Sequence, residues 1–306
     1  MKYMNDFLQT SPFDLYELSL FNLVVKHHSF TKAAEAAGLT QSAITRQIQG
    51  IENSLGVELL ERTTRNVQLT KAGAFLFQES LRLLGDVDQS LRRLKEDFAN
   101  ARKEIRVGVS RSVSLAHLPG FFHENLRKHL KVNYNVSYQP SAEILAALEA
   151  NELDLGVLCP PPRLPGTLCI THRFADVFTL IAPAELASQY FALSKSGVNG
   201  WLHEQSWLLI DEKTNTGKKL RRWMAASNLK IEPSVQLDSF DLIITLVSIG
   251  MGISFVPVRS LALYGQKKRL VRLRLPNRFE RELVVLMRRH RKQPEHLKEF
   301  IKNILF

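Results

Sequence analysis

The sequence predicts an α/β protein in which an N-terminal winged helix-turn-helix leads, through a long linker helix, into a two-lobed α/β module. Three observations support this fold class. Residues 14–60 carry apolar side chains at helical spacing, and residues 72–101 contain no proline. After residue 103, short apolar strands alternate with helical stretches, which is typical of a parallel sheet with crossover helices.

Composition limits the classes of protein to which the chain can belong. The 306 residues are 45% hydrophobic and 23% charged and include only two cysteines, as in a globular protein without a disulfide framework. Acidic residues interrupt the first 20 positions, and the weakly charged stretch 242–258 contains Gly, Ser and Pro. We therefore expect a cytoplasmic protein with no secretory signal, no membrane span and no membrane partner.

The net charge of +11 suggests a polyanionic partner, but the charge is distributed unevenly. Residues 1–70 carry six Lys and Arg against seven Asp and Glu, whereas residues 271–306 carry ten against four. Because the excess positive charge is C-terminal, an argument for nucleic-acid binding has to rest on a local motif.

The segment 29–48 has the pattern of a helix-turn-helix. Ala34 is small where two helices would cross, Gly38 tolerates the positive φ of the turn, and Ile44 can face the first helix from the second. The hydroxyl of Thr40 is placed to cap the second helix. Two ordinary packed helices joined by a glycine would satisfy part of the same pattern.

Polar side chains on and beside the second helix are the candidate DNA contacts. Amides, hydroxyls and guanidinium groups can hydrogen-bond to base edges and phosphates in a major groove. The candidate DNA-binding residues are Thr31, Thr40, Gln41, Ser42, Thr45, Arg46 and Gln49, with Arg62 and Arg65 from the segment that follows.

Residues 55–73 predict the end of a helix, a two-stranded wing and the start of a new helix. Arg62 and Arg65 give the wing cationic reach beside the recognition helix, which suits contact with phosphates or a minor groove. Arg62 could instead pair with Glu58 or Glu61, so its role has two interpretations.

A long helix is predicted from Ala72 to about Ala101. Its apolar side chains recur every seven residues, and a second set follows three positions later, which forms an a/d seam. Charged residues crowd the remaining surface. This favours a narrow contact stripe that pairs with another copy, and the alternative is a helix buried on a globular domain. The seam consists of Phe77, Leu84, Leu91 and Phe98 with Ser80, Val87, Leu94 and Ala101.

The region after Lys103 divides into two α/β series. The first predicts strands at 105–109, 132–138 and 153–158 and helices at 117–129 and 142–150, and it ends in the proline-rich segment 159–165. The second predicts strands at 177–182, 207–210, 234–237 and 253–256 and helices at 218–227 and from 240. Strands at 270–274 and 282–287 and a helix at 296–305 close the chain, and periodicity alone does not assign them to a lobe.

Many N-terminal positions match the pattern of a known family. The matching residues are Phe21, Ser29, Phe30, Thr31, Ala33, Ala34, Leu39, Thr40, Gln41, Ser42, Ala43, Arg46, Gln47, Ile48, Ile51, Glu52, Leu55, Gly56, Leu60, Arg62, Leu69, Thr70, Ala72 and Gly73. With the two-lobed region, the whole chain resembles a LysR-type transcriptional regulator. The resemblance implies a sequence-specific DNA-binding regulator whose effector module is similar to type 2 periplasmic binding proteins.

The resemblance also implies a domain plan and partners. It places a winged DNA-binding domain at 1–71, a linker/dimerisation helix at 72–102 and a regulatory domain at 103–306. Lobe I would comprise about 103–163 and 271–306, and lobe II about 164–270. The implied partners are double-stranded DNA, a second or further copies in a homodimer or homotetramer, and the transcription machinery. Because one winged domain is nearly neutral, pairing two of them would multiply its weak attraction to DNA.

Hydroxyl and amide side chains near predicted strand ends define a candidate effector cleft. In two-lobed sheets, small ligands lie beyond the carboxyl ends of strands and near helix N-termini. Such groups suit a carboxylate or another anion, although each residue could equally be a plain helix cap. The candidate effector-binding residues are Ser110, Arg111, Ser112, Gln139, Ser141, Thr214, Thr216 and Met251.

The sequence offers little support for phosphate-loop, metal-binding or enzymatic chemistry. The segment 215–219 lacks the glycine and hydroxyl that a phosphate-binding loop needs, and we expect no metal, no cofactor beyond the effector, and no enzymatic activity. Cys159 and Cys169 could form a redox switch, but no basic residue lies directly beside Cys159, and structural roles are expected for both. The chain departs from the family at 128–132, where a usual proline is missing, and at 183–191, where a histidine-proline pair is missing. The alternative function is a cytoplasmic small-molecule-binding protein or enzyme with a helical dimerisation arm.

Overall fold

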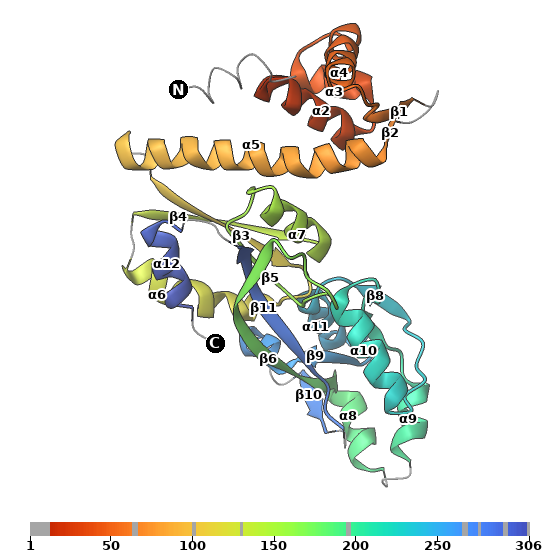
Figure 1. The fold of residues 1–306 in the computed structure, drawn as a ribbon. Helices are drawn as coiled ribbons and strands as arrows, with labels where there is room; N and C mark the ends of the chain where they lie inside the picture. The colour runs from red at the N-terminus through yellow and green to blue at the C-terminus, as the bar shows by residue number, and fades with distance from the viewer. Residues whose placement is uncertain are drawn as a thin grey trace. The chain divides into compact units, whose positions relative to one another are not determined.

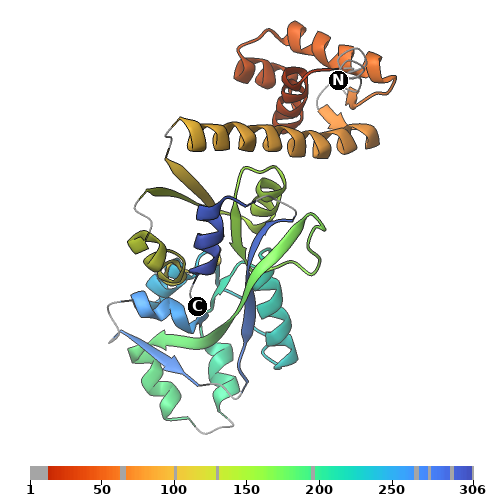
Figure 2. The same ribbon diagram turned by 60° about the vertical axis from the view of Figure 1, so that its left-hand side comes forward.

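The computed structural model describes residues 13–62, 67–99, 102–128, 131–193, 197–264, 269–274, 277–289 and 293–304. The chain forms two compact units, Met1–Asn100 and Ala101–Phe306 (Figures 1 and 2). Arg65, Ala101, Arg291 and Lys292 lie outside the described residues. Within the described part, no helix is long and apolar enough to cross a membrane.

In the described residues, the first unit consists of three short helices, a two-stranded wing and one long helix. They are α2 (Leu15–His27), α3 (Phe30–Ala37), α4 (Gln41–Leu55), β1 (Leu60–Arg62), β2 (Val67–Leu69) and α5 (Lys71–Phe98). Ser29 and Thr40 cap α3 and α4, and Gly38 ends α3 with a φ of 67°. Phe21 and Ile44 are fully buried in the core that these helices share. The predicted helix-turn-helix is therefore confirmed.

The wing is fixed to the helices by backbone contacts. Leu60 pairs with Leu69 in the antiparallel β1–β2 ribbon. A carboxylate oxygen of Glu52 accepts hydrogen bonds from the backbone nitrogens of Leu59 and Leu60, at 2.8 and 3.1 Å. Gly73 lies so close to the wing that a Cβ there would be 1.9 Å from the Leu59 carbonyl oxygen.

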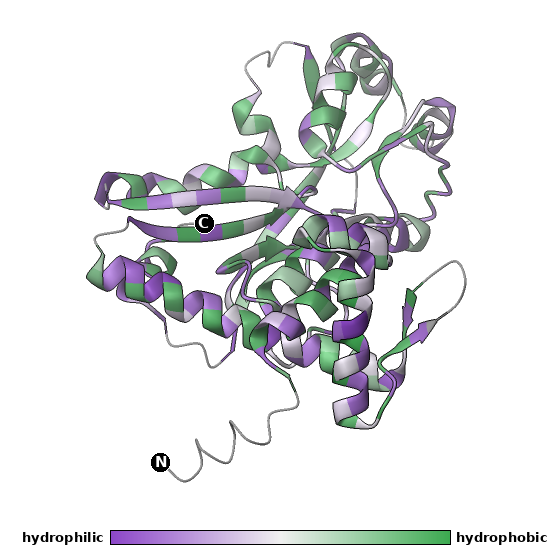
Figure 3. Cartoon of the chain, turned by 90° about the horizontal axis from the view of Figure 1, so that it is seen from above, coloured by the Kyte–Doolittle hydropathy of each residue, from purple (hydrophilic) through white to green (hydrophobic). Residues whose placement is uncertain are grey.

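The long helix α5 packs against α2 through its N-terminal half. Ser80 is buried, and its hydroxyl donates to Asn22 Oδ1 on α2 at 2.6 Å. Further along, five apolar side chains of α5 are exposed in the single chain. They are Leu83, Val87, Leu91, Leu94 and Phe98. Figure 3 shows hydrophobic and hydrophilic positions interleaved along the helices, as expected for amphipathic elements.

The second unit is built on a mixed sheet. In the described residues it has seven strands in the order β10-β6-β11-β5-β3-β4, with β9 also paired to β6, and a separate β7–β8 pair. β3 runs parallel to β4 and β5, whereas β11 is antiparallel to β5 and β6. The strands are β3 (Lys103–Ser110), β4 (Val132–Gln139), β5 (Leu155–Leu158), β6 (Leu168–Pro183), β7 (Leu208–Ile210), β8 (Val235–Leu237), β9 (Ser254–Pro257), β10 (Leu270–Leu273) and β11 (Glu280–Arg288).

Helices cover this sheet and complete the lobes. The first lobe carries the 3-10 helix η1 (Leu115–His117), α6 (Leu118–Lys128), α7 (Ser141–Glu149) and α12 (Glu295–Lys302). The second carries α8 (Ala184–Phe191), α9 (Val198–Glu204), α10 (Asn215–Ala226), α11 (Phe240–Ser248) and the 3-10 helix η2 (Val258–Leu263). Helices α8 and α9 were not predicted from the sequence, because they are short and weakly patterned.

In the described residues, the second lobe has one cluster of buried apolar side chains and the first lobe has two. Strand β6 contributes to all three clusters, whereas β11 contributes to the two of the first lobe. Phe174 and Leu283 belong to one first-lobe cluster, whereas Phe178 and Phe279 belong to the second-lobe cluster. The change of lobe thus falls inside β6 and at the start of β11 and differs from the expected boundaries near 164 and 271. The physical reason is that β6, with 16 residues, is much longer than the predicted strand at 177–182.

Candidate functional site

Helix α4 has a buried apolar side and an exposed polar side. Ile44 and Ile48 are fully buried in the core of the first unit. Gln41, Ser42 and Arg46 are exposed on the remaining surface. The core thus leaves free the side of α4 that carries the predicted DNA contacts.

Hydroxyl groups hold the start of α4. Thr40 Oγ1 accepts a hydrogen bond from the backbone nitrogen of Ala43 at 3.2 Å and lies 3.1 Å from Ser42 Oγ. From α3, Thr31 Oγ1 donates to Gln41 Oε1 at 3.3 Å. The amide oxygen of Gln41 is therefore oriented by α3, which reduces the conformational freedom that a DNA contact would otherwise remove.

The side chains of Thr45 and Arg46 donate hydrogen bonds to backbone carbonyls of the preceding turn. Thr45 Oγ1 donates to the Gln41 carbonyl at 2.8 Å, and Arg46 Nε donates to the Ser42 carbonyl at 3.4 Å. Gln49 is half-buried on the same helix. The terminal nitrogens of Arg46 have no partner among the described residues, so they can approach a base edge as a fork.

The wing residues can be placed only in part. The backbone of Arg62 pairs with Val67 in the ribbon, but its side chain and the whole of Arg65 lie outside the described residues. The alternative partners of Arg62, Glu58 and Glu61, therefore stay open. Lys71 is exposed where α5 begins.

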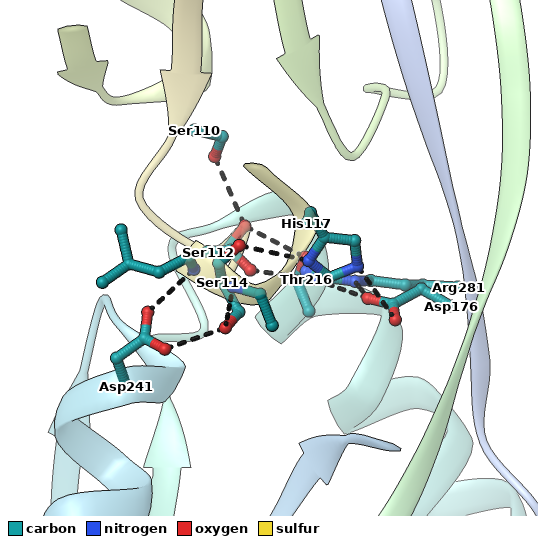
Figure 4. Close-up of polar contacts among 10 residues, drawn as sticks. Ser110, Ser112, Ser114, His117, Asp176, Thr216, Asp241 and Arg281 are labelled. Carbon is teal, nitrogen blue, oxygen red and sulfur yellow. Dashed lines mark hydrogen bonds and ion pairs between the residues drawn. The ribbon is translucent and has the colours of Figure 1, made fainter. Parts of the chain in front are cut away.

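Four hydroxyl groups from the predicted effector cleft lie together, and Figure 4 shows three of them, on Ser110, Ser112 and Thr216. Ser110 Oγ is 3.1 Å from Ser141 Oγ and 3.3 Å from Ser112 Oγ, and Ser112 Oγ is 3.3 Å from Thr216 Oγ1. Ser110 is the last residue of β3 in the first lobe and Ser112 follows that strand, whereas Thr216 lies in α10 of the second lobe. These hydroxyls meet where the two lobes adjoin.

Arg281 is the centre of this cluster, and the sequence analysis missed it. The residue is 1% exposed. Its guanidinium donates to Asp176 Oδ2 from Nε at 2.9 Å and from NH2 at 2.8 Å. NH1 donates to Thr216 Oγ1 at 2.6 Å, and NH2 also donates to the Ser112 carbonyl at 2.9 Å. One cation thereby links both lobes and both long strands.

A signal for this residue existed in the sequence. Arg281 lies two positions before the apolar run 283–287, in the same strand. A charged residue inside a buried strand requires a partner, because an unpaired buried charge is costly. Its partner Asp176 is 105 positions away, and no local pattern connects the two.

His117 extends the cluster into the first lobe. Its Nδ1 lies 3.2 Å from the Ser114 carbonyl, and its Nε2 lies 3.3 Å from Asp176 Oδ1, an ion-pair contact without hydrogen-bond alignment. Burial alone would raise the pKa of Asp176. The close contact with His117 and the charge of Arg281 outweigh burial and lower that pKa below its ordinary value.

Two aspartates of the second lobe bind the loop after β3. Arg111 NH1 is 2.8 Å from Asp238 Oδ2, and this partner raises the pKa of Arg111. Asp241, in the first turn of α11, accepts from Ser114 Oγ at 2.8 Å and from the Leu115 backbone nitrogen at 3.2 Å. Arg111, which was expected to meet an anion, is thus already paired.

The remaining candidate effector residues do not join the cluster directly. Thr214 caps α10 by accepting from the Gly217 nitrogen at 2.9 Å and donates to the Asp211 carbonyl at 2.7 Å, which fits the helix-cap alternative. Gln139 has a buried Oε1 with no partner among the described groups. Met251 is 47% exposed in the turn that follows α11.

Both cysteines lie in the described part of the chain. Cys159 is buried, and Cys169 is partly buried; both are free thiols. The Cys159 carbonyl accepts from Asn215 Nδ2 at 3.0 Å. In the parts of the chain that the structure describes, no group of three His, Cys, Asp or Glu side chains is placed to hold a metal ion.

Comparisons with known families agree with this architecture. Residues 15–74 match the family described as "Bacterial regulatory helix-turn-helix protein, lysR family", and residues 99–305 match "LysR substrate binding domain". The chain belongs to the LysR family of transcriptional regulators. It is a DNA-binding transcriptional regulator with an effector-binding domain, and the alternative of a binding protein or enzyme with a dimerisation arm is not supported.

Individual relatives match this chain over most of its length. An uncharacterized HTH-type transcriptional regulator, YfeR of Shigella flexneri, is 26% identical over 281 residues, which cover 91% of this chain and 89% of that protein. A full-length OxyR variant from Pseudomonas aeruginosa has a TM-score of 0.66 at 18% identity, with 95% and 94% coverage. CbnR in complex with its target DNA has a TM-score of 0.64 at 19% identity, with 95% and 99% coverage.

Proposed function

We propose that this regulator reads duplex DNA with the exposed side of α4 and steadies the complex with its wing. The observation that carries this proposal is the polar surface of Gln41, Ser42, Thr45 and Arg46, which no part of the core uses. Amide and guanidinium groups on one helix face are suited to base edges in a major groove. Arg62 and Arg65 would add phosphate or minor-groove contacts.

The proposal includes a homodimer or a homotetramer formed through α5. Five large apolar side chains are exposed after Ser80 on this helix in the single chain, and exposed apolar surface is stabilised by contact with a partner. A second copy would bring a second α4 to the same duplex. Because the first 70 residues are nearly neutral, two copies would raise affinity where one binds weakly.

We also propose that a small-molecule effector acts between the lobes and changes their relation without turnover. A ligand with hydrogen-bond acceptors, such as a carboxylate, would suit the four hydroxyl groups there. They belong to Ser110, Ser112, Ser141 and Thr216. The ligand would have to compete with the existing contacts, because Arg281 already engages Thr216. No other cofactor is required, and the protein would act in the cytoplasm, where chromosomal DNA is accessible.

DNase footprinting tests the DNA-reading part of the proposal. The full-length protein is offered the DNA flanking its own gene at several salt concentrations. We expect protection of two half-sites on one face of the duplex, with protection decreasing as salt increases. Equal binding to every duplex, or none at low ionic strength, would contradict sequence-specific reading by α4.

A further inference from the structure

The second lobe contains a cavity that is separate from the hydroxyl cluster. It has a volume of about 400 Å³ and lies where β6, β10 and the start of η2 adjoin. Five polar side chains form its wall. Arg272 lies in β10 and Arg274 directly follows it, Asn277 and Arg278 precede β11, and Thr179 lies in β6. This volume is within the range of small-molecule sites, which is about 300–1,000 Å³.

Strand geometry places two of these cations on one face. Leu273 pairs with Leu180 and is buried in the core, so its neighbours Arg272 and Arg274 point to the opposite face of β10. Because Arg272 and Arg274 are two positions apart in extended backbone, their Cα atoms are separated by about 7 Å. That spacing lets both guanidinium groups reach one small ligand.

The cavity carries positive charge without compensation. Arg272, Arg274 and Arg278 are exposed, and their side chains make no ion pair or hydrogen bond with the part of the chain that the structure describes. None of the described residues that line the cavity is acidic. Three cations around one concave surface repel one another, and an anion bound there would relieve this repulsion.

We propose that this cavity is a second ligand site, which binds a small phosphorylated anion carrying at least two negative charges. A guanidinium group matches phosphate oxygens with two parallel hydrogen bonds, and three such groups favour a ligand with several oxygens. Val177 and Val258 add a limited apolar wall for the rest of the ligand. The site does not depend on an effector between the lobes.

Inorganic pyrophosphate is the probe for this site. Its binding to the full-length protein is measured by isothermal titration calorimetry at low ionic strength. The variant Arg272→Gln/Arg274→Gln is compared with Lys218→Gln/Arg222→Gln, which removes two exposed cations of α10 in the same lobe that do not line the cavity. Thermal unfolding without pyrophosphate checks that both variants are folded.

We expect pyrophosphate to bind the native protein and to lose affinity about 10- to 100-fold in Arg272→Gln/Arg274→Gln, because charge-assisted hydrogen bonds are lost. Affinity in the α10 control should change by less than about twofold. Equal loss in both variants, or no binding to the native protein, would overturn the proposal. So would a fall in duplex DNA affinity in the cavity variant alone, since the cations would then serve DNA.

Discussion

Arg281 and Asp176 are direct cross-strand partners on β11 and β6, and one carboxylate oxygen of Asp176 accepts two hydrogen bonds from the guanidinium. Both side chains are buried. On one side of this pair the strands belong to the first-lobe core, and on the other side to the second. The ion pair therefore lies where the two lobes join (Figure 4).

Removing one partner of this pair should be strongly destabilising. Asp176→Asn leaves Arg281 buried without its anion, and we expect the free energy of unfolding to fall by about 3–5 kcal/mol. Urea titration followed by circular dichroism measures the change. Asp238→Asn is the control, because it breaks the exposed pair with Arg111 and should cost no more than about 1 kcal/mol. Equal effects of the two variants would contradict a special role for the buried pair.

The same pair predicts how stability depends on pH. The folded-state pKa of Asp176 is lowered, so its contribution is present above the unfolded pKa of about 4 and is lost as pH falls through the folded pKa. The difference in unfolding free energy between the native protein and Asp176→Asn should therefore shrink below about pH 4. Urea titrations between neutral and acidic pH measure it. A constant difference across this range would show that the carboxylate charge does not matter.

Arg46 should determine base preference. Arg46→Ala is expected to weaken specific DNA binding by about 1–3 kcal/mol and to relax selectivity at particular bases. Lys71→Ala, which removes an exposed cation beyond the wing, should weaken binding evenly across sequences and reduce its salt dependence. Fluorescence anisotropy with single-base operator variants measures both. The assignment of Arg46 fails if its loss also acts evenly on every sequence.

The exposed stripe of α5 should control assembly. Leu91→Glu/Leu94→Glu places two charges where we propose a second helix packs, so the protein should become monomeric and bind its operator much more weakly. Sedimentation velocity and anisotropy measure these changes. The control Ala74→Glu/Gln78→Glu adds the same charge at exposed α5 positions on the side of the helix opposite the stripe and should leave assembly intact. A dimer that survives the first change would place the interface elsewhere.

Two glycines of the first unit should respond oppositely to alanine. A Cβ at Gly73 would overlap the Leu59 carbonyl oxygen, so Gly73→Ala should destabilise the fold by about 1–3 kcal/mol. Gly50 on α4 has open space at the same position, and Gly50→Ala should stabilise by up to about 1 kcal/mol. Thermal unfolding of both variants gives the signs. Similar values would show that the wing can move away from α5.

The sequence by itself determined the local elements. Caps at Ser29 and Thr40, the left-handed turn at Gly38 and the apolar spacing of α4 act within a few residues, so the helix-turn-helix was predictable from neighbouring positions. The short helices α8 and α9 were missed because brief elements carry little periodicity. The wing side chains and the role of Arg65 stay predictions.

Only the tertiary structure decided how distant polar groups combine. Arg281 meets Thr216 and Asp176 across 65 and 105 positions of sequence, and such contacts follow from strand register and lobe packing. The same packing placed the change of lobe in the middle of β6 and at the start of β11 and paired Arg111 with Asp238. Local propensity carries no information on these encounters, because their energy depends on burial and on partners that folding alone brings together.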